Sequence, residues 1–496
     1  MARPKKDITD SNNHTMSGKD TGTAAVRYQR ARQAHWDEVA CGLDSWKSWG
    51  GYYHQRLAQI YQFLVAPGQR VLELGCGQGD LLAALKPAVG VGVDFSIEMV
   101  ERARRQRPNL RFIHADAHEL PLNEKFDVII LSDLANDLWD VQEVLRQLER
   151  LTTPRTRIIM NTYSRLWEQP LALVEKLGLA KPTLFQNWLT VEDLTGLLRL
   201  ADFEVIRHWP EIIFPLRAPL LTALANRYLV KLWPFRLFAL TNFIIAQPRP
   251  QLAPMTEEPL VSVIVPARNE AGNIPAIFAR TPEMGRGTEL VFVEGHSVDG
   301  TYEAIQQVMA AYPKRRCRLF RQTGTGKGDA VRLGFAKANG GVLMILDADL
   351  TVPPEDLPRF YEALRSGKCE FANGVRLVYP MEKQAMRFFN LVGNKFFSLA
   401  FSWLLGQPIK DTLCGTKVMW KTDYERIAAN RHYFGDFDPF GDFDLLFGAA
   451  RLNLRIVDVP IRYRERTYGN TNIQRWRHGW LLLKMILFAA RRIKFV

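Results

Sequence analysis

Two β/α alternations, each opening on an apolar strand, constrain the fold of this chain more than any other feature. The first opens at residues 71–74 (VLEL) and the second at residues 260–266 (LVSVIVP). Residues 247–258 between them are rich in proline and polar residues, which is typical of a linker. Because strands of a parallel sheet are buried on both faces and appear as continuous apolar runs, we predict two α/β domains with mainly parallel sheets.

The domain boundaries follow from this division. Residues 1–24 lack hydrophobic periodicity and are predicted to be a disordered arm. Residues 25–246 are predicted to form the first domain and residues 259–470 the second, since a chain of 496 residues exceeds the size of one hydrophobic core. Residues 471–496 are predicted to form a basic, apolar C-terminal helix.

The charge of the chain is compatible with several kinds of anionic binding partner and does not distinguish among them. There are 65 Lys and Arg against 52 Asp and Glu, and the net charge of +13 suits nucleic acid, an anionic membrane or phosphorylated substrates. Five cysteines without ligand spacing indicate reduced thiols. The sequence shows no signal peptide and no run of the ~20 apolar residues that span a bilayer. We therefore expect a cytoplasmic protein that is not integral to a membrane but can lie on the inner face of the cytoplasmic membrane.

The turn after the first strand has the chemistry of a nucleoside site. Residues 75–80 (GCGQGD) join the strand to a helix, and their glycines let the backbone approach a ligand beside the helix N-terminus. Glu73 would repel a pyrophosphate but not a cationic sulfonium. Asp94 ends a second strand about 20 residues further on, where an acid can hold ribose hydroxyls, and Asp116 ends a third. Each aspartate alone fits a helix cap, but their order and spacing favour a cofactor site.

This succession resembles the class I S-adenosylmethionine-dependent methyltransferases over residues 50–245 and implies a Rossmann-like domain. By that resemblance the cofactor site contains Gly75, Gly77 and Gly79 around the methionine part, Asp94 at the ribose, Asp116 and Ala117 beside the adenine, and Glu73 before the loop.

The methyl acceptor is not identified by the sequence. His114, His118 and Tyr163 are candidate acid–base groups, and each is equally compatible with ordinary packing. A fourth strand ends near Asp133. We assign no methyl-transfer base.

Two aspartates one residue apart, Asp347 and Asp349, follow the apolar run VLMIL and predict a metal site. At the mouth of a parallel sheet such carboxylates can hold Mg²⁺ or Mn²⁺, which neutralises a departing diphosphate. No cluster of Lys or Arg directly beside this pair in the sequence could do so alone. Two acids at a strand end often only solvate a turn, so the surrounding motifs decide between the two interpretations.

Those motifs resemble the family 2 glycosyltransferases over residues 259–470, most of all the polyprenyl-phosphate sugar transferases of the dolichol-phosphate mannosyltransferase kind. The resemblance implies a GT-A fold, a UDP- or GDP-linked sugar as donor, Mn²⁺ or Mg²⁺ as cofactor, and a polyprenyl phosphate or glycan as acceptor. It implies these site residues: Pro266, Arg268, Glu270 and Glu294 at the base; Asp347, Ala348 and Asp349 at the metal and diphosphate; Arg376 at a phosphate; Asp411 and Lys417 near the sugar and acceptor; and Arg466 in a phosphate loop.

Three positions depart from the family pattern. Gly295 replaces a second acid, Thr351 replaces a glutamine that binds metal, and Asn472 replaces the last lysine of the phosphate loop. The identity of the sugar and of the base therefore cannot be read from the sequence.

The chemistry of the sugar acceptor stays open. A hydroxyl acceptor needs a base, and Asp442 or Asp444 stands where the family has its acid. A lipid phosphate, with its second pKa near ~6, is already nucleophilic. In either case, attack opposite the leaving nucleotide inverts the anomeric centre, and the candidate catalytic residues are Asp349, Asp442 and Asp444.

Two apolar segments suit a membrane surface. No acid follows Glu465, and the C-terminal run WLLLKMILFAA has basic flanks. Residues 388–406 are also apolar enough for an interfacial position. Core helices or an oligomer interface are equally compatible with both segments.

The two resemblances together suggest a bifunctional enzyme of a cell-envelope polysaccharide pathway that transfers a sugar and a methyl group. The alternative is one catalytic domain with the other as a binding or scaffolding module. We expect no nucleic-acid partner.

Overall fold

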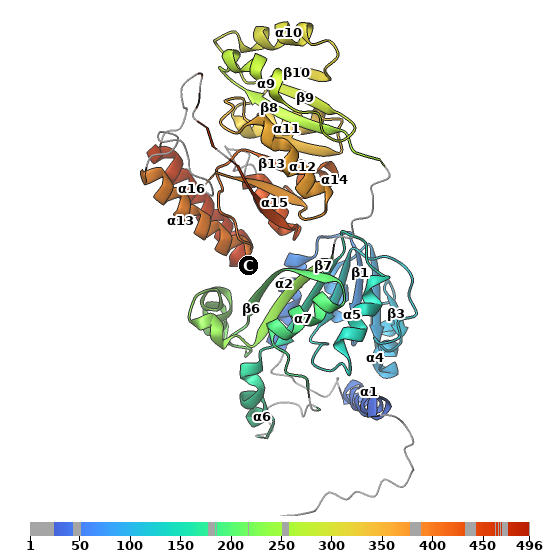
Figure 1. Ribbon diagram of the computed structural model, residues 1–496. Helices are drawn as coiled ribbons and strands as arrows, with labels where there is room; N and C mark the ends of the chain where they lie inside the picture. The colour runs from blue at the N-terminus through green and yellow to red at the C-terminus, as the bar shows by residue number, and fades with distance from the viewer. Residues whose placement is uncertain are drawn as a thin grey trace, which may run out of the picture.

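The computed structural model describes residues 24–42, 51–176, 184, 186–216, 218–249, 257–376, 388–431, 443–461, 463–464, 466, 468 and 475–495. These residues form two domains, each built on one sheet with helices packed against it (Figure 1). Residues 1–23, most of the predicted arm, lie outside this set.

The N-terminal sheet has seven strands in the order β3-β2-β1-β4-β5-β7-β6. Its strands are β1 (Arg70–Leu74), β2 (Val89–Asp94), β3 (Arg111–His114), β4 (Val128–Ser132), β5 (Arg157–Tyr163), β6 (Phe203–Glu211) and β7 (Thr241–Pro248). Only β7 is antiparallel to its neighbours, β5 and β6. β7 extends through Pro248, two residues into the predicted linker. β2 pairs with one side of β1 and β4 with the other, so the direction of strand addition reverses at β1. Such a topological switch point opens a ligand crevice at the carboxyl ends of the strands.

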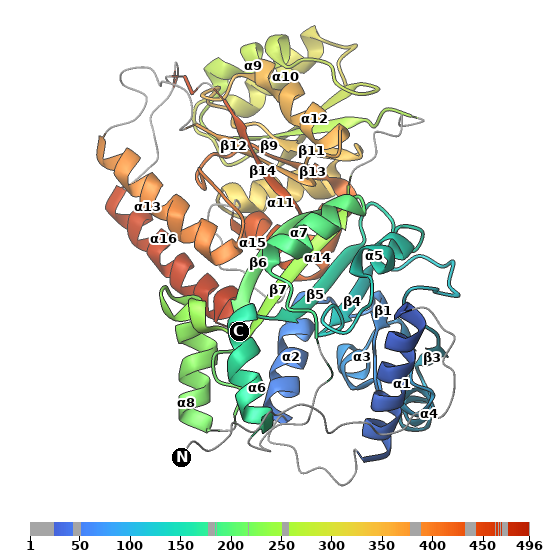
Figure 2. The ribbon, with the colours of Figure 1, turned by 60° about the horizontal axis from the view of Figure 1, so that its bottom comes forward.

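Helices cover both faces of this sheet (Figure 2). They are α1 (Ala24–Gly42), α2 (Gly51–Leu64), α3 (Asp80–Leu85), α4 (Ile97–Gln106), α5 (Val141–Glu149), α6 (Glu168–Lys176), α7 (Val191–Leu200) and α8 (Pro219–Ala223). Successive residues of β1 point to opposite faces, so Val71 packs into one core and Leu72 into the other. Ser96 caps α4 by accepting the N–H of Met99, which fixes the helix directly after Asp94.

The C-terminal sheet also has seven strands, in the order β10-β9-β8-β11-β13-β12-β14. Its strands are β8 (Val261–Ala267), β9 (Thr288–Glu294), β10 (Cys317–Arg321), β11 (Val342–Ile345), β12 (Phe371–Val375), β13 (Lys417–Trp420) and β14 (Ile456–Pro460). β13 is antiparallel to both β11 and β12. The switch point lies between β8 and β11, and the two predicted metal ligands follow β11.

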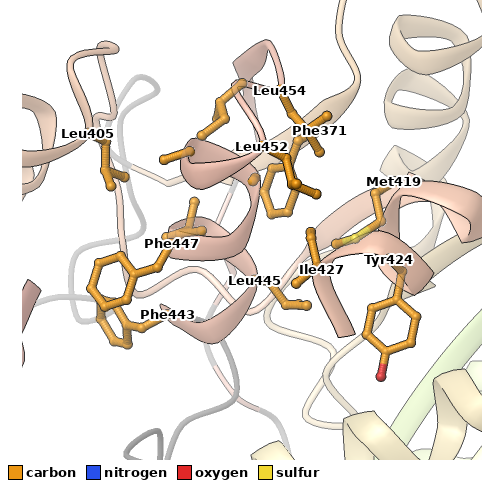
Figure 3. Close-up of a cluster of buried hydrophobic side chains, with 14 of the residues drawn as sticks. Phe371, Leu405, Met419, Tyr424, Ile427, Phe443, Leu445, Phe447, Leu452 and Leu454 are labelled. Carbon is orange, nitrogen blue, oxygen red and sulfur yellow. The ribbon is translucent and has the colours of Figure 1, made fainter. Parts of the chain in front are cut away.

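The helices of this domain are α9 (Ile274–Arg280), α10 (Thr301–Ala311), α11 (Lys327–Lys337), α12 (Leu357–Arg365), α13 (Phe388–Leu405), α14 (Lys421–Ala429), α15 (Phe443–Arg451) and α16 (Arg475–Ala489). Figure 3 shows part of the core, where Ile427 of α14 lies beside Leu445 of α15, while Phe443 and Phe447 of α15 point to the other side of that helix. Short 3₁₀ and π segments complete the chain: η1 (Arg165–Trp167), η2 (Leu224–Tyr228), η3 (Leu229–Lys231), η4 (Phe235–Phe238), η5 (Ala271–Asn273), η6 (Pro354–Asp356) and η8 (Ala490–Lys494).

The two apolar segments form α13 and α16, which lie side by side (Figure 2). Leu482, Met485 and Ala489 of α16 belong to the core of the second domain. Neither helix, nor any other within the described ranges, is long and apolar enough to cross a membrane.

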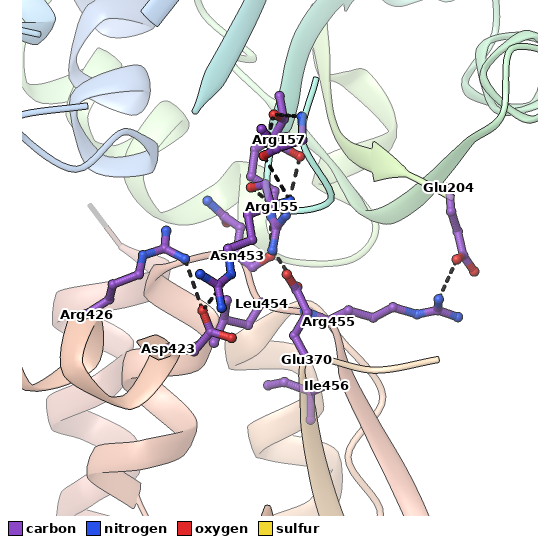
Figure 4. A network of polar contacts seen from close by, with 12 residues as sticks. Arg155, Arg157, Glu204, Glu370, Asp423, Arg426, Asn453, Leu454, Arg455 and Ile456 are labelled. Atoms are coloured by element: carbon purple, nitrogen blue, oxygen red, sulfur yellow. Dashed lines mark hydrogen bonds and ion pairs between the residues drawn. The ribbon is translucent and has the colours of Figure 1, made fainter. Parts of the chain in front are cut away.

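Polar contacts join the two domains (Figure 4). Arg157 of β5 pairs with Glu370 and donates from Nε to the carbonyl oxygen of Asn453 at 2.9 Å. Arg455 pairs with Glu204 of β6, and Arg207 Nη2 donates to Asn453 Oδ1 at 2.6 Å. The far edge of the first sheet is therefore fixed against the second domain.

Candidate functional site

The glycine turn after β1 is held in shape by Asp94. Gly75, Gly77 and Gly79 have φ of 68°, 50° and 77°, which glycine adopts at low cost. One carboxylate oxygen of Asp94 accepts the N–H of Gly77 at 2.8 Å, and the other accepts the N–H of Ser96 at 2.9 Å. Burial raises the pKa of Asp94, although these backbone hydrogen bonds oppose the rise. The turn and the end of β2 are thus one polar unit.

Open space lies beside the middle glycine. A Cβ on Gly77 would meet no atom within 4 Å, whereas one on Gly79 would lie 2.5 Å from the ring of Phe112. Glu73 is 3% exposed, and its Oε2 has no hydrogen-bond partner within the described part of the chain. Burial raises the pKa of Glu73 well above its usual value. An orphaned carboxyl oxygen beside an open glycine turn fits a small ligand such as the expected sulfonium cofactor.

Asp116, the predicted adenine contact, is paired with a histidine. Its Oδ1 accepts the N–H of His118 at 2.8 Å and lies 2.6 Å from His118 Nδ1. Burial raises the pKa of Asp116, but the hydrogen bonds from His118 outweigh burial and lower it. His118 therefore orients Asp116. Ala117 packs against the core, and His114 Nε2 lies 3.0 Å from the carbonyl oxygen of Phe95.

A carboxylate without an assigned role follows β4. Asp133 accepts from the hydroxyl of Tyr53, at 2.9 and 3.0 Å to its two oxygens, and from Asn161 Nδ2 at 2.6 Å. The rings of Tyr53 and Tyr163 stack at 5.9 Å, and Trp188 lies 6.4 Å from Tyr163. Burial raises the pKa of Asp133 to about 7 against the opposing hydrogen bonds. Aromatic rings thus surround a group that can change protonation near neutral pH.

The Asp133 turn contacts the glycine turn. A Cβ on Gly75 would lie 2.8 Å from Cδ1 of Leu134, the residue after Asp133. The carboxylate is therefore next to the place where the methyl donor is expected.

In the second domain, both aspartates after β11 pair with cations from distant segments. Asp347 Oδ1 lies 2.7 Å from Lys327 Nζ at the start of α11. Asp349 Oδ2 accepts from Arg466 Nη2 at 2.9 Å, and its Oδ1 accepts from the Thr351 hydroxyl at 2.8 Å. Burial raises the pKa of Asp349, but these bonds outweigh it and lower the pKa. Neither cation is a neighbour of the pair in the sequence: Lys327 and Arg466 come from distant segments, and Arg466 belongs to the predicted phosphate loop.

The loops after β8 and β9 reach the same edge of the sheet. Arg466 Nη2 lies 3.3 Å from Glu270 Oε1 and so bridges Glu270 and Asp349. Asp299 accepts a backbone N–H from η5 at 3.1 Å, and the Tyr468 hydroxyl donates to it at 3.4 Å. The segments that follow β8, β9 and β11 therefore meet the segment near residue 466 at one edge of the sheet.

Residues 410–417 pack directly on this site. A Cβ on Gly415 would collide with Asp347 Oδ2 and Lys327 Nζ, so any other residue there would have to displace these two side chains. The backbone of this segment thus closes one side of the aspartate pair.

Three predicted residues form a buried cluster: Asp411 and Lys417 at the two ends of that segment, and Arg376 after β12. Arg376 donates two hydrogen bonds to Asp411, at 2.7 and 2.9 Å. Asp411 and Lys417 are both 0% exposed, and Lys417 donates to the carbonyl oxygen of Cys414. Although burial opposes it, the Asp411 carboxylate raises the pKa of Arg376. The guanidinium predicted to contact a phosphate is therefore engaged by Asp411.

The comparisons with known proteins agree with this division. Residues 66–201 match the family described as "Methyltransferase domain", and residues 262–424 match "Glycosyl transferase family 2". The chain joins a methyltransferase domain to a family 2 glycosyltransferase domain. The expected fold class, a Rossmann-like domain followed by a GT-A domain, is confirmed.

The glycosyltransferase domain has curated relatives. A dolichol-phosphate mannosyltransferase of Pyrococcus furiosus is 29% identical over 47% of this chain and 67% of the relative. A polyprenol monophosphomannose synthase of Mycolicibacterium smegmatis is 28% identical over 42% of this chain and 78% of the relative. Other matches cover as little as 36% of the relative's length. A solved S-adenosylmethionine-dependent methyltransferase of Thermotoga maritima, 18% identical, covers 43% of this chain and 99% of that one at a TM-score of 0.35.

The remaining predicted residues of the glycosyltransferase domain lie in different settings. Pro266 is in β8, Arg268 is exposed on the following loop, and Ala348 is buried between the two aspartates. Glu294 ends β9 and accepts the N–H of Ser297.

One of the two candidate bases for a hydroxyl acceptor is paired with an arginine. Asp444 is 8% exposed on α15 and accepts from Arg431 at 2.8 Å. Asp442 lies outside the described residues.

The oxygens at the aspartate pair suit a hard cation. Asp347, Asp349 and Thr351 offer carboxylate and hydroxyl oxygens, the ligand type that Mg²⁺ and Mn²⁺ take. Across the described part of the chain, no three His, Cys, Asp or Glu side chains gather as a metal site. The donor chemistry fits a divalent cation, and metal binding stays a prediction.

The residues of these sites that the sequence did not identify include Lys327, Asp299, Asp133 and Tyr53. Lys327 had a signal, because TGTGKG is a glycine-rich turn that opens a helix. The other three had none, since an aspartate after a strand and a tyrosine in a helix are common.

Proposed function

We propose that the chain is a bifunctional enzyme. The glycosyltransferase domain transfers a sugar from a nucleotide sugar to a polyprenyl phosphate with inversion, and the methyltransferase domain transfers a methyl group from S-adenosylmethionine. The observation that carries the first activity is the aspartate pair after β11 with Lys327 and Arg466 against it. The relatives named as acting on dolichol or polyprenol phosphates support the lipid acceptor rather than a glycan.

The glycosyltransferase site handles negative charge. Lys327 and Arg466 are placed to meet the charge that develops on a departing nucleoside diphosphate. A divalent cation held by Asp347 and Asp349 would add to this neutralisation. A lipid phosphate needs no base at neutral pH, so the buried pairing of Asp444 with Arg431 is compatible with this acceptor.

The test is donor and acceptor dependence. Purified full-length protein is incubated with UDP- and GDP-linked sugars, with and without polyprenyl phosphate, in Mn²⁺ or in chelator. We expect nucleotide release from one donor that rises on adding polyprenyl phosphate and stops in chelator. If no nucleotide sugar releases its nucleotide in Mn²⁺, the proposal is wrong. If a glycan stimulates nucleotide release and polyprenyl phosphate does not, the acceptor is a glycan.

For methyl transfer, we propose that Asp133 takes the proton of the acceptor. Bound S-adenosylmethionine supplies an electrophilic methyl group, and the glycine turn with Glu73, Asp94, Asp116 and Ala117 would hold it. An acceptor N–H or O–H would hydrogen-bond to Asp133 while its lone pair attacks the methyl carbon. The Asp133 carboxylate would take the acceptor proton as the methyl group is transferred and S-adenosylhomocysteine is released. The contact of Leu134 with the glycine turn supports this placement.

A further inference from the structure

A long connection joins β6 to β7. Antiparallel neighbours need only a two-residue turn, yet residues 212–240 separate these strands and contain α8 and η2 to η4. The connection has no Asp or Glu, and its cations are Arg217, Arg227, Lys231 and Arg236. It is also unused by either proposed reaction.

Much of its apolar surface is exposed. Leu220 is 90% exposed and Trp233 is 74% exposed. In the described part of the connection, the large apolar side chains at the surface are Leu216, Leu220, Leu221, Leu224, Tyr228, Leu232, Trp233, Phe235, Leu237 and Phe238. Single exposed apolar side chains are ordinary, but so many on one short connection point to an interaction surface.

Buried polar contacts hold the connection in one shape. The side chain of Asn226, 0% exposed, accepts the N–H groups of Ile213 and Phe214, each at 2.8 Å. Lys231 forms a buried ion pair with Glu211 of β6. The apolar side chains are therefore displayed by a fixed scaffold.

This surface continues onto α13 and α16 of the other domain, whose ends lie near the connection (Figure 2). Arg227 Nε donates to the carbonyl oxygen of Phe495 at 2.8 Å, and Trp403 Nε1 donates to that of Lys231 at 3.2 Å. Along α16 and the η8 segment that follows it, exposed positions recur at helical spacing and alternate apolar with basic: Trp480, Lys484, Leu487 and, in η8, Arg491. On α13, Phe396 and Leu399 are exposed.

We propose that residues 212–240 and the exposed faces of α13 and α16 form one surface that docks on an anionic phospholipid bilayer. Exposed apolar side chains would enter the interface, and the exposed basic side chains Arg227, Arg236, Lys484 and Arg491 would meet the headgroups. A second copy of the chain is a poorer occupant, because it would bring Arg227, Arg236 and Arg491 against their own counterparts. Both domains would then lie on the same membrane. The connection is also close to the Asp133 site, because Thr241, the residue that follows it, lies 3.2 Å from the hydroxyl of Tyr53, which bonds to Asp133.

The test needs neither substrate nor cofactor, so its outcome is independent of both proposed activities. Full-length protein is sedimented with phosphatidylcholine vesicles that contain or lack phosphatidylglycerol. We expect binding only with phosphatidylglycerol and weaker binding at high salt. The triple variant Leu220→Ser, Leu221→Ser, Trp233→Ser should lower the partition coefficient by roughly tenfold or more. The control Leu200→Ser, at a 64% exposed leucine at the end of α7, should not change it.

All three substituted side chains are exposed, so the circular dichroism and melting temperature of the triple variant should match the wild type. A wild type that ignores both kinds of vesicle, or a triple variant that binds undiminished, would overturn the proposal. A third result would also overturn it: a wild type that is a dimer in sedimentation velocity and binds no vesicles, with a triple variant that is a monomer. That result would assign the surface to a second copy of the chain.

Discussion

Asp349 takes part in two kinds of contact, since Arg466 and Thr351 donate to different oxygens of its carboxylate. Asp349→Ala removes the predicted metal ligand and leaves Arg466 with one acidic partner fewer. We expect sugar transfer to fall by about 100-fold or more, measured as nucleotide release with polyprenyl phosphate present. Asp356→Ala, in η6, is the control and should retain activity.

Chelator tests the same aspartates without a substitution. Excess EDTA should abolish transfer by the wild type, and Mn²⁺ or Mg²⁺ should restore it. If transfer persists both in EDTA and in Asp349→Ala, the carboxylates only hold the turn and the cation Arg466 in place.

Asp94 is the residue on which the cofactor site of the first domain depends. Asp94→Ala should weaken S-adenosylmethionine binding about 10- to 100-fold, because hydrogen bonds to a charged group contribute about 1.5–3 kcal/mol. Calorimetry on the full chain measures this affinity. Asp94→Asn retains one acceptor oxygen for the turn and should weaken binding less, whereas equal affinity in all three proteins would remove Asp94 from the site.

Asp133 gives a pH dependence to methyl transfer. Its carboxyl must be ionised to accept a proton, and its pKa is raised to about 7 by burial. The rate should therefore fall as pH decreases through about 7, and it should rise to a plateau above that value. In Asp133→Asn this limb should disappear and the remaining rate should be low. A wild-type rate that stays constant from pH 6 to 8, about one unit on each side of the pKa, would contradict the assignment.

The local parts of both sites could be predicted from the sequence, and the long-range parts could not. Gly77 and Asp94 lie within one strand–turn–helix–strand unit, so spacing alone relates them. Arg466 and Asp349 are 117 residues apart, and the resemblance assigns both to the phosphate site, but only the folded chain shows that they bond to each other. Asp133 was missed because its character comes from burial and from Tyr53, 80 residues away.

At the scale of elements, α16 shows where composition misleads. Its basic and apolar residues suggest a surface helix, but it has two apolar faces. One face carries Leu482 and Met485 into the core, and the other exposes Trp480 and Leu487. Removing residues 471–496 would therefore open the core as well as remove a surface.

Substituting two leucines of α16 one at a time distinguishes its contribution to the core from its contribution to the surface. Leu482 is 4% exposed and Leu487 is 57% exposed. Leu482→Ala should lower the free energy of unfolding by about 2–5 kcal/mol, while Leu487→Ala should change it by no more than about 0.5 kcal/mol. Urea denaturation measures both, and vesicle binding should weaken only in Leu487→Ala. Equal losses of stability would mean that α16 is buried on both faces.

At the scale of the whole molecule, the two domains meet through charged groups removed from water. Arg157 and Glu370 are 6% and 14% exposed, and Asn453, 2% exposed, bonds to Arg157, Arg207 and the carbonyl oxygen of Leu64. The linker alone would leave the domains free to move. This interface keeps α13, α16 and the β6–β7 connection on one surface.

Glu370→Ala tests that coupling. It leaves the Arg157 guanidinium buried without its carboxylate, and losing one partner of a buried pair costs about 3–5 kcal/mol. We expect the wild type to melt in one calorimetric transition and Glu370→Ala to melt in two, because the domains no longer stabilise each other. Arg146→Ala, which breaks an exposed pair with Glu143 within α5, should melt as the wild type does. A single unshifted transition in Glu370→Ala would show that the domains fold independently of this contact, and the common membrane surface would then need another source of rigidity.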